Sequence, residues 1–535
     1  MAPQPNRDSL DFQDATSMLY FQEFVGLLQG SSWNIAASTG DLWTVTLPQL
    51  TRGSSTLRYA AMAIGSLSKW YQSTSTSLRN VTVPASQTAI EDAHYFQAVT
   101  YYCQALKMQS QRPSLQDAVF LSILSLFFEI LRGNRKAALD HVNHGLALLL
   151  AVTTDAAATT NFAPDPRPVL GAVAEVFTQL IGQARTVLRG RVGQGPPLPH
   201  LVTGLRKARH TFESFMMLLS ELPRSATPTP STALIPATFG SLDEFERHWM
   251  LSRRSQARMA SIMADTMQAS GGAPPGSLDD AALARFYDGL LSNTRIRDFC
   301  ADSRREMRAL DAAFAPLFDA VVADAEPGDP AYLKALHLRL QYLGVVLFED
   351  PPQYACVETV RARTPVFREY VSLAATALGA AAAKGERRTN PAAQLSLQCG
   401  VAFNLCLLAL FCRDPLVRNQ AVGLLEGYPG QDGLWNTRAL HALAARNRVV
   451  ERVNAVEGTD EERWRRLWRR EMVFEEAGER VLLRYLDRDA ESGEWQLVEE
   501  VGEVRAREEQ VCWRRQPLTG SGAPLLADLY AFYSD

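Results

Sequence analysis

The chain has 535 residues, of which 47% are hydrophobic and 21% are charged, so it is long enough to bury a large core. Its formal net charge of −4 provides no overall basic field, which argues against a protein that its total charge draws to nucleic acid. The longest apolar run, residues 118–131, contains two serines and a glutamate and is shorter than the about 20 residues that span a bilayer. We therefore expect no membrane segment.

Helical periodicity dominates the chain, because apolar residues recur three and four positions apart. The pattern predicts helices over residues 18–29, 99–110, 115–131, 135–150, 169–189, 203–221, 241–269, 279–292, 300–322, 331–348, 363–383, 391–412, 415–426, 434–454 and 460–486. No strand pattern of comparable length occurs before residue 490. The predicted fold class is therefore all-α, a large irregular array of antiparallel helices with long loops rich in Pro, Ser and Ala.

The helices predicted over 115–131 and 135–150 form a hairpin, since Gly133 and Asn134 supply a turn between them. Glu129 lies on the otherwise apolar first helix. A buried carboxylate needs a cation or hydrogen-bond donors to stay charged. We expect Glu129 to pair with an Arg, Lys or His across the hairpin, in a structural rather than a catalytic role.

Composition divides the chain into a disordered tail at 1–17, one helical domain over 18–490 and a partly ordered C-terminal segment at 491–535. Segments rich in Pro, Gly, Ser and Thr interrupt the domain near 151–168, 191–199, 222–240 and 270–277. We interpret them as loops, with a domain boundary at 222–240 as the alternative. Residues 491–510 mix acidic and apolar residues and fit either an activation-type segment or a short helix or strand packed on the array.

The seven cysteines are scattered, which argues against a disulfide framework and for a reducing compartment. None forms the closely spaced pair that tetrahedral zinc ligation needs, so no metal site and no cofactor are predicted. Cys399, Cys406 and Cys412 are six and seven residues apart in an apolar run, and we expect them on a buried helix, where free cysteine packs as a small hydrophobe.

Three stretches carry a family resemblance. The first is 55–71, STLRYAAMAIGSLSKWY, and the second is 94–150, with Glu129, Gly133, Ala137, His141 and Gly145 at the family's acidic, turn and histidine-glycine positions. The third, 406–452, is the most specific and matches at Cys412, Arg413, Asp414, Arg418, Ala421, Leu424, Leu425, Gly433 and Trp435. Together they resemble the helical regulatory region of the fungal zinc-cluster transcription factors.

Members of that family usually carry an N-terminal six-cysteine cluster that binds two zinc ions and reads DNA, and this sequence lacks it. The resemblance begins near Leu19 to Phe24, where a linker after the cluster would end. The sequence leaves open whether the cluster was lost from the gene or is missing from the gene model. It assigns no DNA-binding residue, and we expect no direct sequence-specific DNA binding from this chain.

Candidate chemistry is sparse. His141 and His144 are three apart and could share a helix face as metal ligands do, but no carboxylate or cysteine joins them at ligand spacing. We expect core or interface histidines. Asp414 is expected to cap a helix that Pro415 opens, and Trp435 is expected to anchor the start of the next helix, with ligand stacking as the alternative.

Residues 463–470, RWRRLWRR, place Trp464, Leu467 and Trp468 on one helix face with arginines around them. A nucleic-acid or membrane surface is one interpretation. The surrounding glutamates favour an amphipathic helix docked by its tryptophans, with arginines solvated or paired.

No phosphate loop, serine elbow or metalloprotease histidine pair occurs, so no catalytic residue is assigned and no enzyme is expected. The resemblance implies a nuclear, transcription-regulator-like protein that acts through protein partners or an effector, with a homodimer among its expected states. The alternative is a helical scaffold or ligand-binding protein without a direct role in transcription, located in the cytoplasm.

Overall fold

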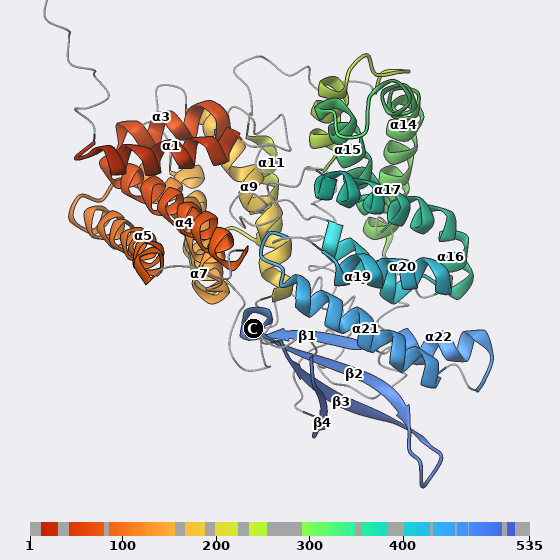
Figure 1. The fold of residues 1–535 in the computed structure, drawn as a ribbon. Helices are drawn as coiled ribbons and strands as arrows, with labels where there is room; N and C mark the ends of the chain where they lie inside the picture. The colour runs from red at the N-terminus through yellow and green to blue at the C-terminus, as the bar shows by residue number, and fades with distance from the viewer. Residues whose placement is uncertain are drawn as a thin grey trace, which may run out of the picture.

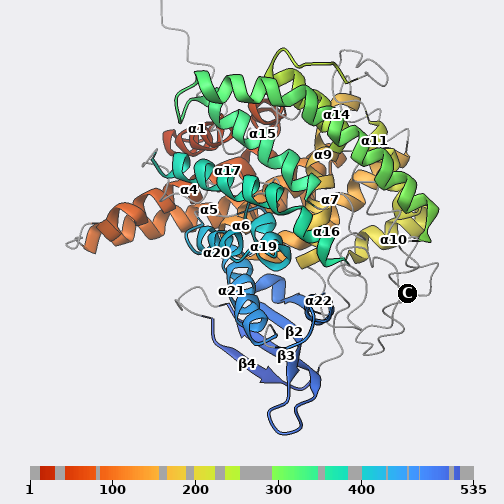
Figure 2. The ribbon, with the colours of Figure 1, turned by 90° about the vertical axis from the view of Figure 1, so that its right-hand side faces the viewer.

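The computed structural model describes residues 12–29, 42–79, 85–155, 166–187, 198–222, 235–253, 292–347, 356–383, 401–428, 432–454, 457–468, 470–504 and 511–518. Over these ranges the chain is predominantly helical, and one small sheet lies at an end of the helical array (Figures 1 and 2). The predicted helical class is confirmed. Within the described residues, no helix combines the length and the apolar character that crossing a membrane requires.

Helices of the first half of the chain pack around α4, which contacts α1, α3, α5 and α6. Figure 1 shows this group in red to yellow. Its elements are α1 (Ala15–Gln29), a π-helical turn η2 (Leu42–Thr46), α3 (Leu47–Gly53), α4 (Ser55–Arg79), α5 (Ala85–Gln111), α6 (Leu115–Leu131), α7 (Arg135–Thr154), α9 (Pro166–Val187), α10 (Pro199–Ala208) and α11 (Phe212–Glu221).

Helices of the second half pack as a separate layer in which α17 contacts α15, α19 and α20. Figure 1 shows them in green and blue. Their bounds are α14 (Thr294–Asp324), α15 (Pro330–Val346), α16 (Val357–Ala362), α17 (Thr364–Ala383), α19 (Val401–Phe411), α20 (Pro415–Glu426), α21 (Thr437–Asn454) and α22 (Asp460–Trp468).

The sheet follows α22 directly and corrects the prediction of one helix over 460–486. Its strands β1 (Glu471–Glu475), β2 (Arg480–Arg488), β3 (Trp495–Glu503) and β4 (Trp513–Gln516) are antiparallel in that order, and a 3-10 turn η4 (Glu476–Gly478) joins the first two. Strand β2 is buried along nearly its whole length. Its sequence, RVLLRYLDR, places charged residues among the apolar ones without the alternation of a half-buried strand, so periodicity alone gave the wrong element. Strand β3 confirms the strand interpretation for part of 491–510.

One further predicted helix, 203–221, is two helices in the structure. Arg209 adopts a left-handed conformation with φ of 55° and ends α10. Thr211 then caps α11 by accepting a hydrogen bond from Ser214 N at 3.1 Å. The prediction over 279–292, much of 241–269 and 391–412, the loop at 270–277 and most of the other loops lie outside the described residues.

The hairpin of α6 and α7 has the predicted turn, and α6 has the predicted bounds. Gly133 takes φ of 75°, which favours glycine. Glu129 is buried and pairs with an arginine as expected, but the partner is Arg132, at 3.4 Å on the end of the same helix, rather than a residue across the hairpin. The three-residue spacing within one helix end was sufficient to satisfy the carboxylate.

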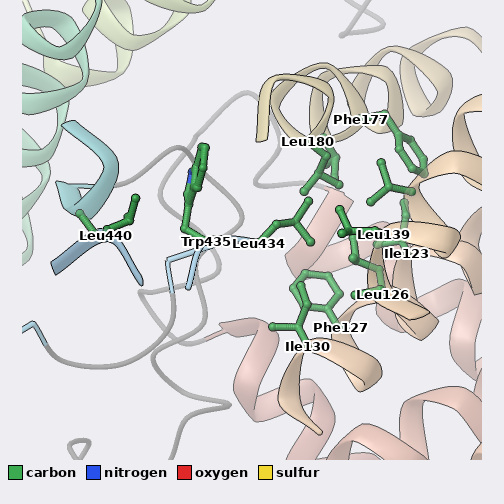
Figure 3. Packing of buried hydrophobic residues seen from close by; sticks show 14 of the residues in the cluster. Ile123, Leu126, Phe127, Ile130, Leu139, Phe177, Leu180, Leu434, Trp435 and Leu440 are labelled. Carbon is green, nitrogen blue, oxygen red and sulfur yellow. The ribbon is translucent and has the colours of Figure 1, made fainter. Parts of the chain in front are cut away.

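One large apolar core connects the two helical groups and the sheet, and Val473, Leu482 and Val501 form a small separate cluster in the sheet. Figure 3 shows Leu434 directed toward Leu180 and Leu139 of the first group, while Trp435 lies on the other side. Trp435 is 1% exposed and stacks on Phe403 at 4.2 Å between ring centroids. The predicted role of Trp435 as an aromatic anchor at the start of α21 is therefore confirmed.

Candidate functional site

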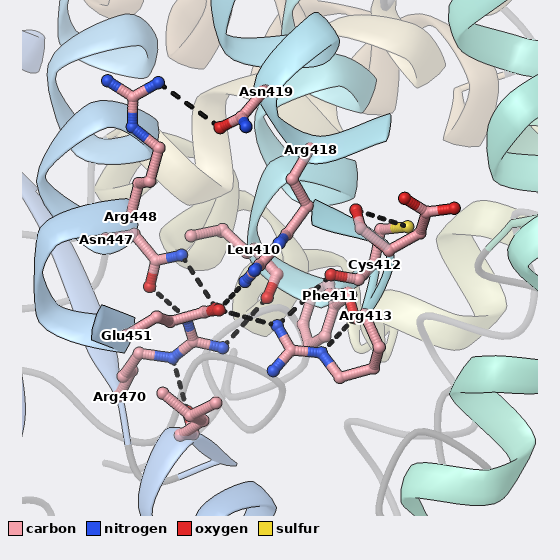
Figure 4. A network of polar contacts seen from close by, with 12 residues as sticks. Leu410, Phe411, Cys412, Arg413, Arg418, Asn419, Asn447, Arg448, Glu451 and Arg470 are labelled. Atoms are coloured by element: carbon pink, nitrogen blue, oxygen red, sulfur yellow. Dashed lines mark hydrogen bonds and ion pairs between the residues drawn. The ribbon is translucent and has the colours of Figure 1, made fainter. Parts of the chain in front are cut away.

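A buried carboxylate, that of Glu451 on α21, lies where α19, α20, α21 and the end of α22 meet (Figure 4). Its side chain is 7% exposed. Arg413 Nη2 donates to its two oxygens at 2.8 and 3.0 Å, and Arg470 Nη1 donates to Oε1 at 3.0 Å. Arg418 forms an ion pair with Oε2, and Asn447 Nδ2 donates at 3.2 Å. We call these five residues the Glu451 cluster.

The link between α19 and α20 is set by local sequence. Asp414 caps α20, because its carboxylate accepts hydrogen bonds from Leu416 N at 2.9 Å and Val417 N at 3.4 Å. Pro415 occupies the first position of the helix, where no N–H is needed. The predicted cap is confirmed, and it fixes where α20 starts and hence where Arg418 emerges, one turn later.

Arg413 is held in this link by the main chain. Its Nε donates to Phe411 O at 3.2 Å and its Nη2 to Cys412 O at 3.3 Å. The guanidinium carbon lies 4.9 Å from the centre of the Trp464 ring, a cation–π distance. These contacts orient the guanidinium toward Glu451.

Arg470 connects the end of α22 to the array. Its side chain is 4% exposed, and its Nε donates to Leu467 O at 2.5 Å. One terminal nitrogen donates to Leu410 O at 3.1 Å, and the other donates to Asn447 Oδ1 as well as to Glu451. The start of the sheet is thereby tied to α19 and α21.

The Glu451 cluster carries more positive than negative charge, since three guanidinium groups share one carboxylate. Burial lowers the pKa of Arg413 to about 10. Burial, followed by the charge of Arg413, lowers the pKa of Arg418 to about 10. Burial and then the charges of both neighbours lower the pKa of Arg470 well below its ordinary value. Because arginine stays protonated in proteins, these directions show that the three charges are held at a desolvation cost, to which the neighbouring guanidinium groups add.

A cleft of about 330 Å³ opens onto this cluster. We call it the arginine cleft, and its described lining residues are Val357, Arg361, Arg413, Pro415, Arg418, Asn419, Arg448, Glu451, Arg452, Asp460, Arg463, Trp464 and Leu467. Six arginines thus face two carboxylates, while Val357, Trp464 and Leu467 provide buried apolar wall. The volume is at the lower end of the range for small-molecule sites.

Arg418 lies in the wall of the cleft with its side chain 19% exposed, and it is incompletely satisfied. Its Nε atom has no hydrogen-bond partner among the described residues, and the same holds for Nε of Arg463. Buried guanidinium nitrogens normally have partners, so each of these two Nε atoms is a donor with unused capacity. At the rim, Arg361 and Arg463 both contact Asp460, at 2.5 and 3.7 Å, which joins α16 to α22.

The chemistry that this lining supports is recognition of an anion. Guanidinium groups bind carboxylates and phosphates through paired N–H donors. The described lining residues include no serine, cysteine, histidine or lysine, and therefore none of the usual nucleophiles or proton-transfer groups apart from the two carboxylates. Those two carboxylates are both already paired with arginine.

The candidate histidines do not meet at a metal site. His141 forms a hydrogen bond with Tyr102 Oη at 3.0 Å, and burial lowers its pKa to about 4. His144 Nδ1 contacts Asp140 O at 2.7 Å, and its ring lies 4.2 Å from that of His200. Over the part of the chain that the structure describes, no group of three metal-ligating side chains is found.

The RWRRLWRR segment contributes to the cleft. Trp464 and Leu467 are buried, as the docked-helix interpretation predicts, whereas the side chains of Arg465 and Trp468 and the whole of residue 469 lie outside the described part. Arg466 lies over the Trp495 ring at 4.3 Å. Arg470 follows the helix and is buried and paired with Glu451, which fits the prediction that these arginines are solvated or paired.

The predicted buried cysteines are confirmed at Cys406 and Cys412, and Cys399 lies outside the described residues. Burial raises the pKa of the Cys406 thiol to about 12, which keeps it protonated and unreactive.

Sequence reasoning quoted Arg413 and Arg418 only for the family resemblance and did not single out Glu451 or Asn447. The signal available was the spacing of Asn447 and Glu451, four residues apart on one face of α21. That spacing does not reveal the partners, since Arg413 precedes Glu451 by 38 residues.

Comparison with known proteins finds no matching family model, no matching curated protein and no matching solved structure.

Proposed function

We propose that this chain is a transcription-regulator-like protein that binds a small-molecule effector in the arginine cleft and acts through protein partners. The observation that carries the proposal is the cleft itself, whose described lining places six arginines against the carboxylates of Glu451 and Asp460. The resemblance of residues 406–452 to the regulatory region of fungal zinc-cluster factors supports the transcriptional role.

An effector bound in the cleft would also be placed to change the surface that the chain offers to a protein partner. Its walls come from α16, the start of α20, α21 and α22, so a bound molecule would contact four elements at once. Through Arg470, the same region holds the first strand of the sheet. Occupancy would therefore stabilise the position of α22 and the sheet relative to the array, as linkage requires of any ligand that prefers one arrangement.

The test compares three strains of the source organism: a gene deletion, an Arg418→Gln replacement and an Arg305→Gln replacement as the matched control. Arg305 is 77% exposed and pairs only locally with Asp302. Transcript profiling should show an overlapping set of changed genes in the first two strains and none in the control. A deletion that alters no transcript, with the protein located in the cytoplasm and absent from the nucleus, would instead support the scaffold or ligand-binding alternative.

A further inference from the structure

The charge balance of the arginine cleft specifies its ligand more narrowly than the proposed function does. Of the three guanidinium groups around Glu451, those of Arg413 and Arg418 line the cleft, and its described lining as a whole holds six arginines against two carboxylates. Uncompensated charge in a partly desolvated site is costly, and a bound counter-charge removes that cost. A ligand that brings two negative charges would offset more of this excess positive charge than a ligand that brings one.

The donors point to the same ligand. Arg418 Nε is buried without a hydrogen-bond partner among the described residues, beside the guanidinium of Arg413. An acid group with two or three oxygens accepts such donors in the paired geometry that guanidinium offers. On α21, Arg448, three residues before Glu451, and Arg452, the residue after it, also line the cleft, and the contact of Arg448 to Asn419 is a long one of 3.5 Å. The rim can therefore meet a second acid group.

The walls limit the size and character of the molecule. Trp464 is 1% exposed and Leu467 6%, so the interior surface beside the arginines is apolar and already desolvated. The about 330 Å³ volume admits a compact metabolite. A nucleic-acid strand is disfavoured, since the chain as a whole carries a formal net charge of −4 and provides no overall basic field.

We propose that the arginine cleft binds a compact organic dianion, a dicarboxylate or a phosphate monoester with an apolar body, through Arg413 and Arg418. Glu451 is the residue that sets the charge preference, because it orients the guanidinium groups and reduces their excess charge from three to two. This inference rests on the proposed function of the cleft as an effector site.

The test is isothermal titration of the purified full chain at neutral pH and constant ionic strength, with sulfate, succinate, phthalate and phenyl phosphate as dianions and with acetate and benzoate as monoanions. Dianions are expected to bind about ten-fold or more tightly than monoanions of similar body, a difference of about 1.4 kcal/mol. Phthalate and phenyl phosphate are expected to exceed sulfate, since only they contact the apolar wall. Their order distinguishes a carboxylate from a phosphate ligand.

Two variants make the result specific. Arg418→Gln should weaken dianion binding by about ten-fold, and Arg305→Gln should leave it unchanged. Arg452→Gln serves if the first variant does not fold, because Arg452 is an exposed rim residue. Equal affinity for dianions and monoanions, or dianion binding that neither cleft variant weakens, would overturn the inference.

The two proposals fail in different ways. Binding of dianions by the purified chain with no transcript affected in the deletion strain would refute only the transcriptional role. If Arg418→Gln changes transcript levels but the purified chain binds none of the tested dianions, only the proposed ligand class is refuted.

Discussion

Replacing Glu451 by Gln tests directly whether the buried arginines depend on one carboxylate. Glutamine keeps the shape of the side chain and its capacity to accept from Asn447, so packing changes little. The variant nevertheless removes the only carboxylate that the structure shows beside Arg470, a side chain that is 4% exposed. Removing one partner of a buried ion pair typically destabilises a protein by about 3–5 kcal/mol, since a charge is left buried and unpaired.

The magnitude is checked by urea denaturation followed by helical circular dichroism, with Asp302→Asn as the control. Asp302 is 71% exposed and pairs with Arg305, so its loss should cost below about 1 kcal/mol. Sulfate at saturating concentration should restore part of the stability of Glu451→Gln, since a ligand at about 100 times its Kd stabilises the native state by about 2.7 kcal/mol. A loss for Glu451→Gln no larger than that of the control would refute the argument that the cluster carries excess charge.

Three further changes test the fold. Gly65→Ala should destabilise the chain by about 1–3 kcal/mol or more in urea denaturation, because a Cβ there would lie 1.9 Å from the carbonyl oxygen of Tyr20 where α4 crosses α1; stability equal to wild type would contradict that close contact. Asp414→Ala should lose about 1 kcal/mol through the cap of α20, while Asp414→Asn should retain most of it. His141, whose pKa is about 4 when folded and 6.5 when free, binds its proton more readily in the unfolded chain. Its contribution should therefore be lost as pH falls from 6.5 to 4, and His141→Gln should flatten the stability profile over that window, measured by thermal unfolding at each pH.

Much of the fold follows from local pattern. Capping and turn geometry are local interactions, so a few residues are enough to predict them. Examples are the apolar run of α6, the glycine at the turn before α7 and the Asp-Pro pair that opens α20. The prediction of one helix over 460–486 was wrong because no such local signal marks a strand that is buried on both faces. Residues 480–488 are buried on both faces of a sheet, and a fully buried strand shows neither period clearly.

The site could not be read in the same way. Its arginines lie in segments that a sequence reader assigns to solvent or to a helix cap, and the carboxylate that joins them is separated from Arg413 by 38 residues and from Arg470 by 19. Only tertiary packing brings these segments together. A charged residue on an amphipathic helix is usually solvated, so nothing in the pattern of α21 marks Glu451 as buried.

Stability alone is a poor explanation for the arrangement. A well-packed apolar group in place of a buried ion pair is often neutral or stabilising, and a cluster with two cations in excess is less favourable than a simple pair. The fold nevertheless places Arg413, Arg418 and Arg470 together. Backbone carbonyls also accept hydrogen bonds from two of these arginines: Phe411 O and Cys412 O from Arg413, and Leu410 O from Arg470. A binding site requires side chains that are already oriented before the ligand arrives, even where this orientation lowers the stability of the protein. The ligand then loses less affinity to the entropy of ordering those side chains. The excess charge is therefore better explained by a ligand of opposite sign than by the needs of the fold.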